Sequence, residues 1–174
     1  MPEQIKQKSN KPNIEDIAAE RLDGKHLANL LDFLDFLKAN KLKLRWHSTD
    51  SWAVRYKNKW VCWLILKNDE PLWFFRPNHI FHKAHLHVSH EKYAFIEYNR
   101  YITDDDVKKL VWDNLQFEKR CEKDCNGFQN REIVGKVFDR ICACWPITIT
   151  APEGAALECS KKLTLVIKTI ISDL

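Results

Sequence analysis

Residues 13–40 carry a helical hydrophobic period. A shorter helix is expected from Asn13, which can cap it, to Gly24, which can end it. Residues 1–12 are polar and have no period, so a frayed tail is predicted there and a single domain over residues 13–174. The second helix is predicted by leucines three and four positions apart, widened by two phenylalanines: Leu27, Leu30, Leu31, Leu34 and Leu37 with Phe33 and Phe36.

After Asn40 the period changes to two, which is typical of half-buried strands. Residues 52–67 are expected to form two antiparallel strands joined near Lys57 and Asn58, because asparagine tolerates the positive φ of a tight turn. With strands at 42–47 and 72–76, this predicts a meander of about four strands. The second hairpin strand is apolar at every position, so it is expected to be central and covered on both faces.

The second half of the chain predicts further strands and two helices. Residues 84–98 have the composition of one or two more strands. Thr103 is expected to cap a helix with an acidic first turn. Residues 120–149 are expected to be a polar loop followed by an irregular path. Thr150 and Glu153 form a capping box that predicts the last helix.

The expected fold class is therefore α+β. It consists of an antiparallel β-meander of about 4–6 strands packed against helices, in the order α-α-β-β-β-β-(β)-α-loop-α.

Composition excludes several classes of enzyme. The 174 residues contain only four glycines, at positions 24, 127, 135 and 154, so neither the dinucleotide-binding nor the P-loop glycine motif can be written. The H-E-x-x-H and G-x-S-x-G motifs are also absent. Because no catalytic signature replaces them, we expect a protein that is not an enzyme.

Charge and hydropathy indicate the cellular compartment that is expected for the protein. The net charge of +4 is mild and selects no partner by itself. The N-terminus lacks the apolar stretch of a signal peptide, and no run approaches the ~18 apolar residues that span a bilayer. A cytoplasmic protein without a membrane partner is expected, and in that reducing setting the cysteines are expected to be thiols or metal ligands.

Four cysteines approximate a structural zinc site. Cys121 and Cys125 are followed, after sixteen intervening residues, by Cys142 and Cys144, which is close to a two-knuckle layout with zinc as its metal. The spacing departs from the usual C-x2-C. An alternative in which Cys142 and Cys144 are small core residues and the other two are incidental thiols therefore stays open.

Histidines form a second candidate metal cluster. Five of the seven lie within residues 79–90, and on a strand His85 and His87 would point to one face, where two ligands can meet a metal. That stretch contains no carboxylate to complete a facial triad, so inert edge histidines are the other interpretation. His47, three residues before Asp50, is interpreted as part of a turn rather than of a catalytic triad.

A basic and aromatic stretch suggests nucleic-acid binding as a further alternative. Residues 38–67 contain eight Lys or Arg and one acid, Asp50, and cations beside exposed aromatic rings could hold phosphates and stack bases. The same pattern is expected of a sheet whose rings face the core and whose lysines face solvent. Only cations and rings on one face would favour binding, and Arg55 is expected to share a face with Trp60.

The favoured interpretation is a ligand-binding or protein-interaction module with an aromatic-lined sheet. Sheets covered by helices leave aromatic-lined concavities, and many large rings are hard to pack without a gap. The partner would be a small molecule or a protein. The gap is expected to be bordered by Phe75 and His47, and the predicted ligand-binding residues are Trp52, Arg55, Tyr56, Trp60, Trp63 and Trp73.

The chain also resembles a family of uncharacterised bacterial proteins. The resemblance is carried by WHSTDSWAVRYKNKWVCWLIL, a cysteine pair, GKVFDRIC and a C-terminal KKL helix. Family members carry a C-x2-C-like cluster where this chain has Cys121 and Cys125 separated by three residues. The meander is similar to the small α+β domains of the YdhG or YjbR type. The resemblance implies a bacterial origin and an α+β fold, and it implies no activity.

Overall fold

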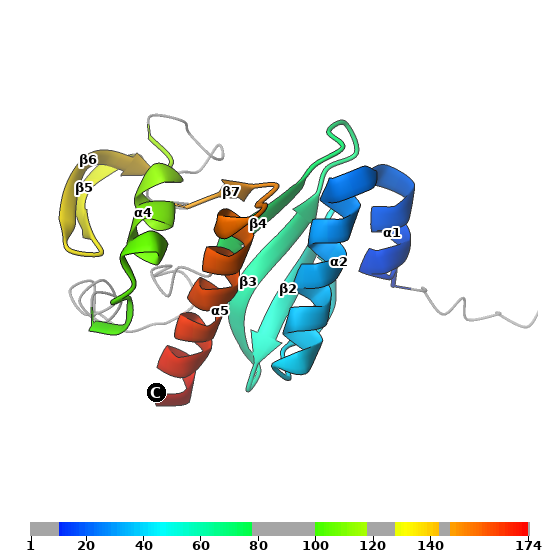
Figure 1. Ribbon diagram of the computed structural model, residues 1–174, viewed down its shortest axis with the longest axis horizontal. Coiled ribbons are helices and arrows are strands. Elements are labelled where there is room, and N and C mark those ends of the chain that lie inside the picture. The colour runs from blue at the N-terminus through cyan, green and yellow to red at the C-terminus, as the bar shows by residue number, and fades with distance from the viewer. Residues whose placement is uncertain (1–10, 78–99, 118–127, 143–146, 174) are drawn as a thin grey trace, which may run out of the picture.

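The computed structural model describes residues 11–77, 100–117, 128–142 and 147–173, and its fold class is α+β, as the sequence predicts (Figure 1). A curved antiparallel sheet is covered by helices, and a separate two-stranded hairpin lies beside α4. The elements in chain order are α1 (Ile14–Arg21), α2 (Gly24–Ala39), β1 (Lys43–Ser48), β2 (Ser51–Tyr56), β3 (Lys59–Leu66), β4 (Trp73–Pro77), α4 (Asp105–Asp113), β5 (Phe128–Ile133), β6 (Lys136–Cys142), β7 (Ile149–Thr150) and α5 (Ala155–Asp173).

The sheet confirms the predicted meander. Its strand order is β1-β2-β3-β4-β7 with every pair antiparallel, so β3 is the central strand. The β2–β3 turn lies at Lys57 and Asn58, whose φ angles are 47° and 63°. Two consecutive residues with positive φ match the tight turn that fits the twist of a hairpin.

Helices α2 and α5 lie on one face of the sheet (Figure 1). Phe33 of α2 packs against Trp73 and Phe75 of β4, with ring centroids 5.7 and 5.4 Å apart. Both β4 rings are fully buried. Burial of such large rings between helix and sheet is the main source of hydrophobic stabilisation in this layer.

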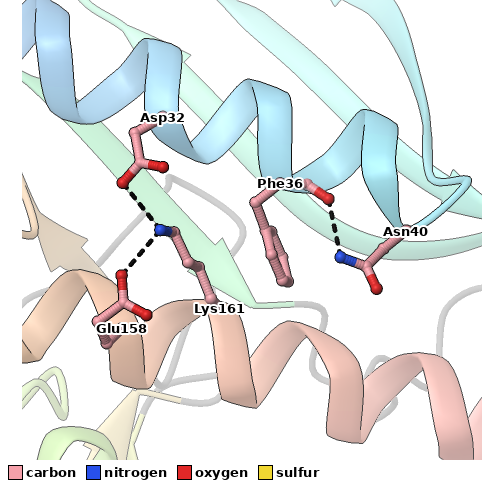
Figure 2. A network of polar contacts seen from close by, with 5 residues as sticks. All are labelled: Asp32, Phe36, Asn40, Glu158 and Lys161. Atoms are coloured by element: carbon pink, nitrogen blue, oxygen red, sulfur yellow. Dashed lines mark hydrogen bonds and ion pairs between the residues drawn. The ribbon is translucent and has the colours of Figure 1, made fainter.

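Polar contacts join the two covering helices (Figure 2). The Lys161 ammonium on α5 donates to Asp32 of α2 and to Glu158 of its own helix, both at 2.8 Å. The Asn40 side chain donates to the Phe36 carbonyl at 2.9 Å and so helps to end α2. Of these contacts, the ion pair of Lys161 and Asp32 joins α5 to α2.

Three predicted helix boundaries were wrong. Gly24 does not end the first helix; α1 ends before Leu22, which is extended and buried, and Gly24 begins α2. The cap of α4 is Asp104 rather than Thr103, because its carboxylate accepts from two backbone N–H groups of the first turn. Thr150 belongs to β7, and Glu153 pairs with Lys25.

The hairpin of β5 and β6 was not predicted. Residues 120–149 were expected to be loop and irregular chain, but β5 and β6 pair antiparallel through a turn at Val134 and Gly135, both with positive φ. The hairpin is held to α4 by the Trp112 indole N–H, which donates to the Ile133 carbonyl at 2.9 Å. A ribbon with much exposed surface carries only a weak hydrophobic period, which explains the miss.

Two other sequence expectations concern the rest of the chain. The strands predicted within residues 84–98 lie outside the described residues. Among the helices that the structure describes, none is long and apolar enough to cross a bilayer.

Candidate functional site

The five-stranded sheet has two chemically different faces. The inner face turns toward α2 and α5 and contributes Trp52, Val54, Leu64, Trp73 and Phe75 to the core. Because side chains alternate along a strand, the residues between these belong to the opposite face. We call it the outer face and define it by Lys43, Arg45, His47, Ala53, Arg55, Trp60, Trp63, Ile65, Phe74 and Arg76.

The six predicted ligand-binding residues divide between these faces. Trp52 and Trp73 are buried on the inner face together with Phe75. Tyr56 packs at the edge of the same core beside the hairpin turn. The structure therefore separates these residues from Arg55, Trp60 and Trp63, which it brings together on the outer face.

A β-bulge makes this grouping possible. The register of β2 and β3 shifts after Val54, so that Arg55 lies opposite Trp60 instead of Val61. Regular alternation from Trp63 would turn Trp60 toward the helices. The bulge instead places Val61 in the core and Trp60 beside Arg55.

The outer-face side chains form a continuous cluster. The Arg55 guanidinium carbon lies 5.5 Å from the centre of the Trp60 ring. Trp60 and Trp63 are 5.3 Å apart with a 54° tilt, and the His47 ring meets Trp63 edge-on at 4.6 Å. We call these four residues the cationic–aromatic cluster. The shared face of Arg55 and Trp60 confirms the expectation from the sequence.

Exposure differs across the cationic–aromatic cluster. Trp63 is only 8% exposed and supports its neighbours from within. His47 is exposed, while Arg55 and Trp60 are half-buried. The Nε of Arg55 is buried and has no hydrogen-bond partner within the part of the chain that the structure describes. Solvent therefore reaches the histidine ring, one indole and the guanidinium.

The charged residues on the strands of the sheet are all positive, and most of them lie on the outer face. Its five strands contain five Lys or Arg and no Asp or Glu: Lys43, Arg45, Arg55, Lys59 and Arg76. Four of them lie on the outer face, and Lys59 lies at the hairpin end opposite Tyr56. Among the described strand residues, the charges around the cationic–aromatic cluster are therefore all positive, which favours an anion.

Tyr56 has its own cationic surroundings. Lys168 and Lys57 lie over its ring, with the ammonium nitrogens 5.1 and 5.6 Å from the ring centre. A side-chain hydrogen bond with Ser172, together with the positive charges of Lys57, Lys168 and Lys41, lowers the pKa of the Tyr56 hydroxyl below its usual value. Lys168 also donates to the Asn40 carbonyl at 2.9 Å, so it stabilises the end of α2.

The predicted zinc ligands cannot be placed. Cys121, Cys125 and Cys144 lie outside the described residues, as do all histidines of residues 79–90. The backbone of Cys142 ends β6 opposite Phe128. Across the described ranges, no group of three or more His, Cys, Asp or Glu side chains could hold a metal ion. Zinc binding through the four cysteines stays a prediction.

The other candidate side chains near the sheet have structural partners. Asp50 accepts from Arg21 at 2.8 Å, which ties α1 to the sheet, and the same guanidinium donates to the Leu66 carbonyl at 2.7 Å. The hydroxyls of Ser48 and Ser51 share a 2.6 Å hydrogen bond across the β1–β2 turn. No triad with His47 is formed by these groups.

Comparisons with protein-family models, with curated proteins and with solved structures find no match to this chain. The resemblance to an uncharacterised bacterial family and to YdhG or YjbR domains therefore stays a prediction.

Proposed function

We propose that this protein is a non-catalytic binding module whose outer face takes an anionic ligand that carries a planar ring. The observation that supports it is the contact of Arg55 with Trp60 on a face that holds four cations and no carboxylate among its strand residues. A guanidinium beside an indole offers an anion-binding fork and a stacking surface in one place.

The chemistry of the cationic–aromatic cluster fits this ligand class. The ring of the ligand would lie against Trp60 and His47, whose own rings are held by the buried Trp63. Its anionic group would accept from Arg55, and the exposed Arg45 would add a second positive charge. Fixed aromatic neighbours reduce the entropy lost when the ligand binds.

Deoxyadenosine monophosphate and deoxyadenosine are suitable probes, with tryptophan fluorescence as the readout. The monophosphate should quench the fluorescence saturably, and the uncharged nucleoside should bind at least about tenfold more weakly, since a hydrogen bond to a charged group is worth about 1.5–3 kcal/mol. Arg55→Gln should weaken binding of the monophosphate by a similar factor and leave the affinity for the nucleoside unchanged. Absence of saturable binding by the monophosphate would overturn the proposal.

A further inference from the structure

We infer that the ligand of the outer face is single-stranded nucleic acid, an inference that rests on the binding function proposed above. The first observation is the charge distribution. Lys43, Arg45, Arg55 and Arg76 lie on one face, and no acidic residue lies on any strand of the sheet. A polyanion is the partner whose charge complements such a surface.

The second observation is how the cations are spaced. Arg45, Ala53, Trp63 and Arg76 pair in one row across β1 to β4. Neighbouring strands are about 4.8 Å apart, so the two arginines at the ends of this row are about 14 Å apart. A mononucleotide reaches one of them, whereas linked nucleotides can reach both while their bases contact Trp60 and His47.

Aggregation control does not explain all of these cations. Lys43 and Arg45 lie on β1, an edge strand, where positive charge discourages pairing with another chain. Arg55 lies on β2 and is paired on both sides, with Lys43 of β1 and with Trp60 of β3. Positive charge at such a position protects no edge, so a binding role accounts better for Arg55.

Stacking separates single strands from other polyanions. In a duplex the base faces are covered by their neighbours, whereas an unpaired base can lie on an indole or imidazole ring, a contact worth about 1–3 kcal/mol. The half-buried Trp60 and the exposed His47 provide such rings beside the cations. The pairing of rings with cations therefore favours single-stranded nucleic acid over an acidic protein or a sulfated polysaccharide.

The test compares deoxyadenylate chains of one, four and twelve nucleotides on the full chain. Affinity should rise with length. For single strands, each neutralised phosphate contributes about −0.7 to the slope of log K plotted against log salt concentration. Three or four phosphate contacts therefore predict a slope of about −2 to −3 for the twelve-nucleotide chain. Its affinity should then fall about 15- to 60-fold between 50 and 200 mM salt.

Matched variants locate the contacts. Arg45→Gln should make the salt slope of the twelve-nucleotide chain shallower by about 0.7. Lys38→Gln removes the same charge from α2, on the helix side of the sheet, and should leave the slope unchanged. Trp60→Leu should lower the affinity at least about fivefold. Trp112→Leu is its control, because Trp112 is also half-buried and also lies under a cation, Lys136, but belongs to α4. Circular dichroism would verify that each variant is folded.

The outcomes separate the two proposals. If the mononucleotide binds but the twelve-nucleotide chain binds no tighter, the nucleic-acid inference is wrong and the binding function stands. Insensitivity to Trp60→Leu, or equal competition by heparin, would likewise overturn the inference, since charge alone would then account for binding. If the mononucleotide does not bind either, both proposals fail.

Discussion

The two faces of the sheet are built by the same four long strands and differ in almost every property. The inner face consists of large apolar side chains that are closed off by α2 and α5, such as Trp73 and Phe75. The outer face carries Arg and Lys beside partly exposed rings. Alternation along a strand lets one short sequence serve as core on one side and as a charged surface on the other.

This difference teaches that tryptophans in one meander need not share one role. Trp52 and Trp73 fill the core, whereas Trp60 touches a guanidinium and remains half-buried. All three rings come from the same meander. For Trp60, the bulge after Val54 decides the face on which the ring lies.

The largest expected effect is a loss of stability when a buried ring of the inner face is removed. Trp73→Ala should lower the free energy of unfolding by about 3–5 kcal/mol, because it leaves a cavity between β4 and α2. Trp60→Ala should cost less than about 2 kcal/mol, since a half-buried ring at the surface leaves no closed cavity. Equilibrium urea unfolding measures both. Equal losses would show that the two faces are packed alike.

The second prediction concerns a pair of like charges on the outer face. Lys43 lies directly opposite Arg55 across β1 and β2, and like charges in that position are destabilising. Lys43→Glu should therefore raise the free energy of unfolding by about 0.2–1 kcal/mol. The same change should weaken binding of the twelve-nucleotide chain, so stability and binding would move in opposite directions.

Lys59→Glu is the matched control for that change. It introduces the same charge on the same sheet, but Lys59 lies opposite Tyr56, so no cross-strand repulsion is relieved. Its free energy of unfolding should stay within about 0.5 kcal/mol of the parent. An equal gain from both variants would mean that net charge, rather than the pair of Lys43 and Arg55, sets the effect.

Much of the fold follows from local pattern. The meander, its hairpin turn at Lys57 and Asn58, and the central position of β3 are all confirmed, because period-two alternation and turn chemistry are visible within a few residues. The β5–β6 hairpin escaped prediction because it buries little on one face. Predictions of helix caps were wrong where a residue is held by a tertiary contact instead, as at Thr150, which pairs with Phe74 in the sheet.

The candidate site was only partly predictable. Arg55, Trp60 and Trp63 were identified as candidates, and the shared face of Arg55 and Trp60 was expected. His47 was expected in a turn and as a polar neighbour of the gap, whereas it lies on β1, beside an irregularity in the β1–β2 pairing, and contacts Trp63. A continuous apolar run such as β3 does not reveal which residues face the core, because either alternation satisfies it.

The smallest expected effect concerns Tyr56, where positive charge reaches the inner side of the sheet. The pKa of Tyr56 in the folded protein should lie below the ordinary value of about 10, and it should rise in Ser172→Ala, because the hydrogen bond with Ser172 is the largest cause of the shift. Lys57→Met should raise the pKa by less. Phenolate absorbance during an alkaline titration, with Tyr56→Phe subtracted, isolates this group from the other tyrosines.

The lowered pKa of Tyr56 also fixes the sign of a pH effect on stability. Because the folded state holds the proton of Tyr56 less tightly than the unfolded state does, ionisation favours folding. This contribution is fully present above the unfolded pKa of about 10 and is lost as the pH falls through the folded value. Parent protein should therefore gain stability relative to Tyr56→Phe as the pH rises toward and beyond about 10. A constant difference between the two across that range would contradict the assignment and leave Lys168 with its hydrogen bond to the Asn40 carbonyl at the end of α2 as its role.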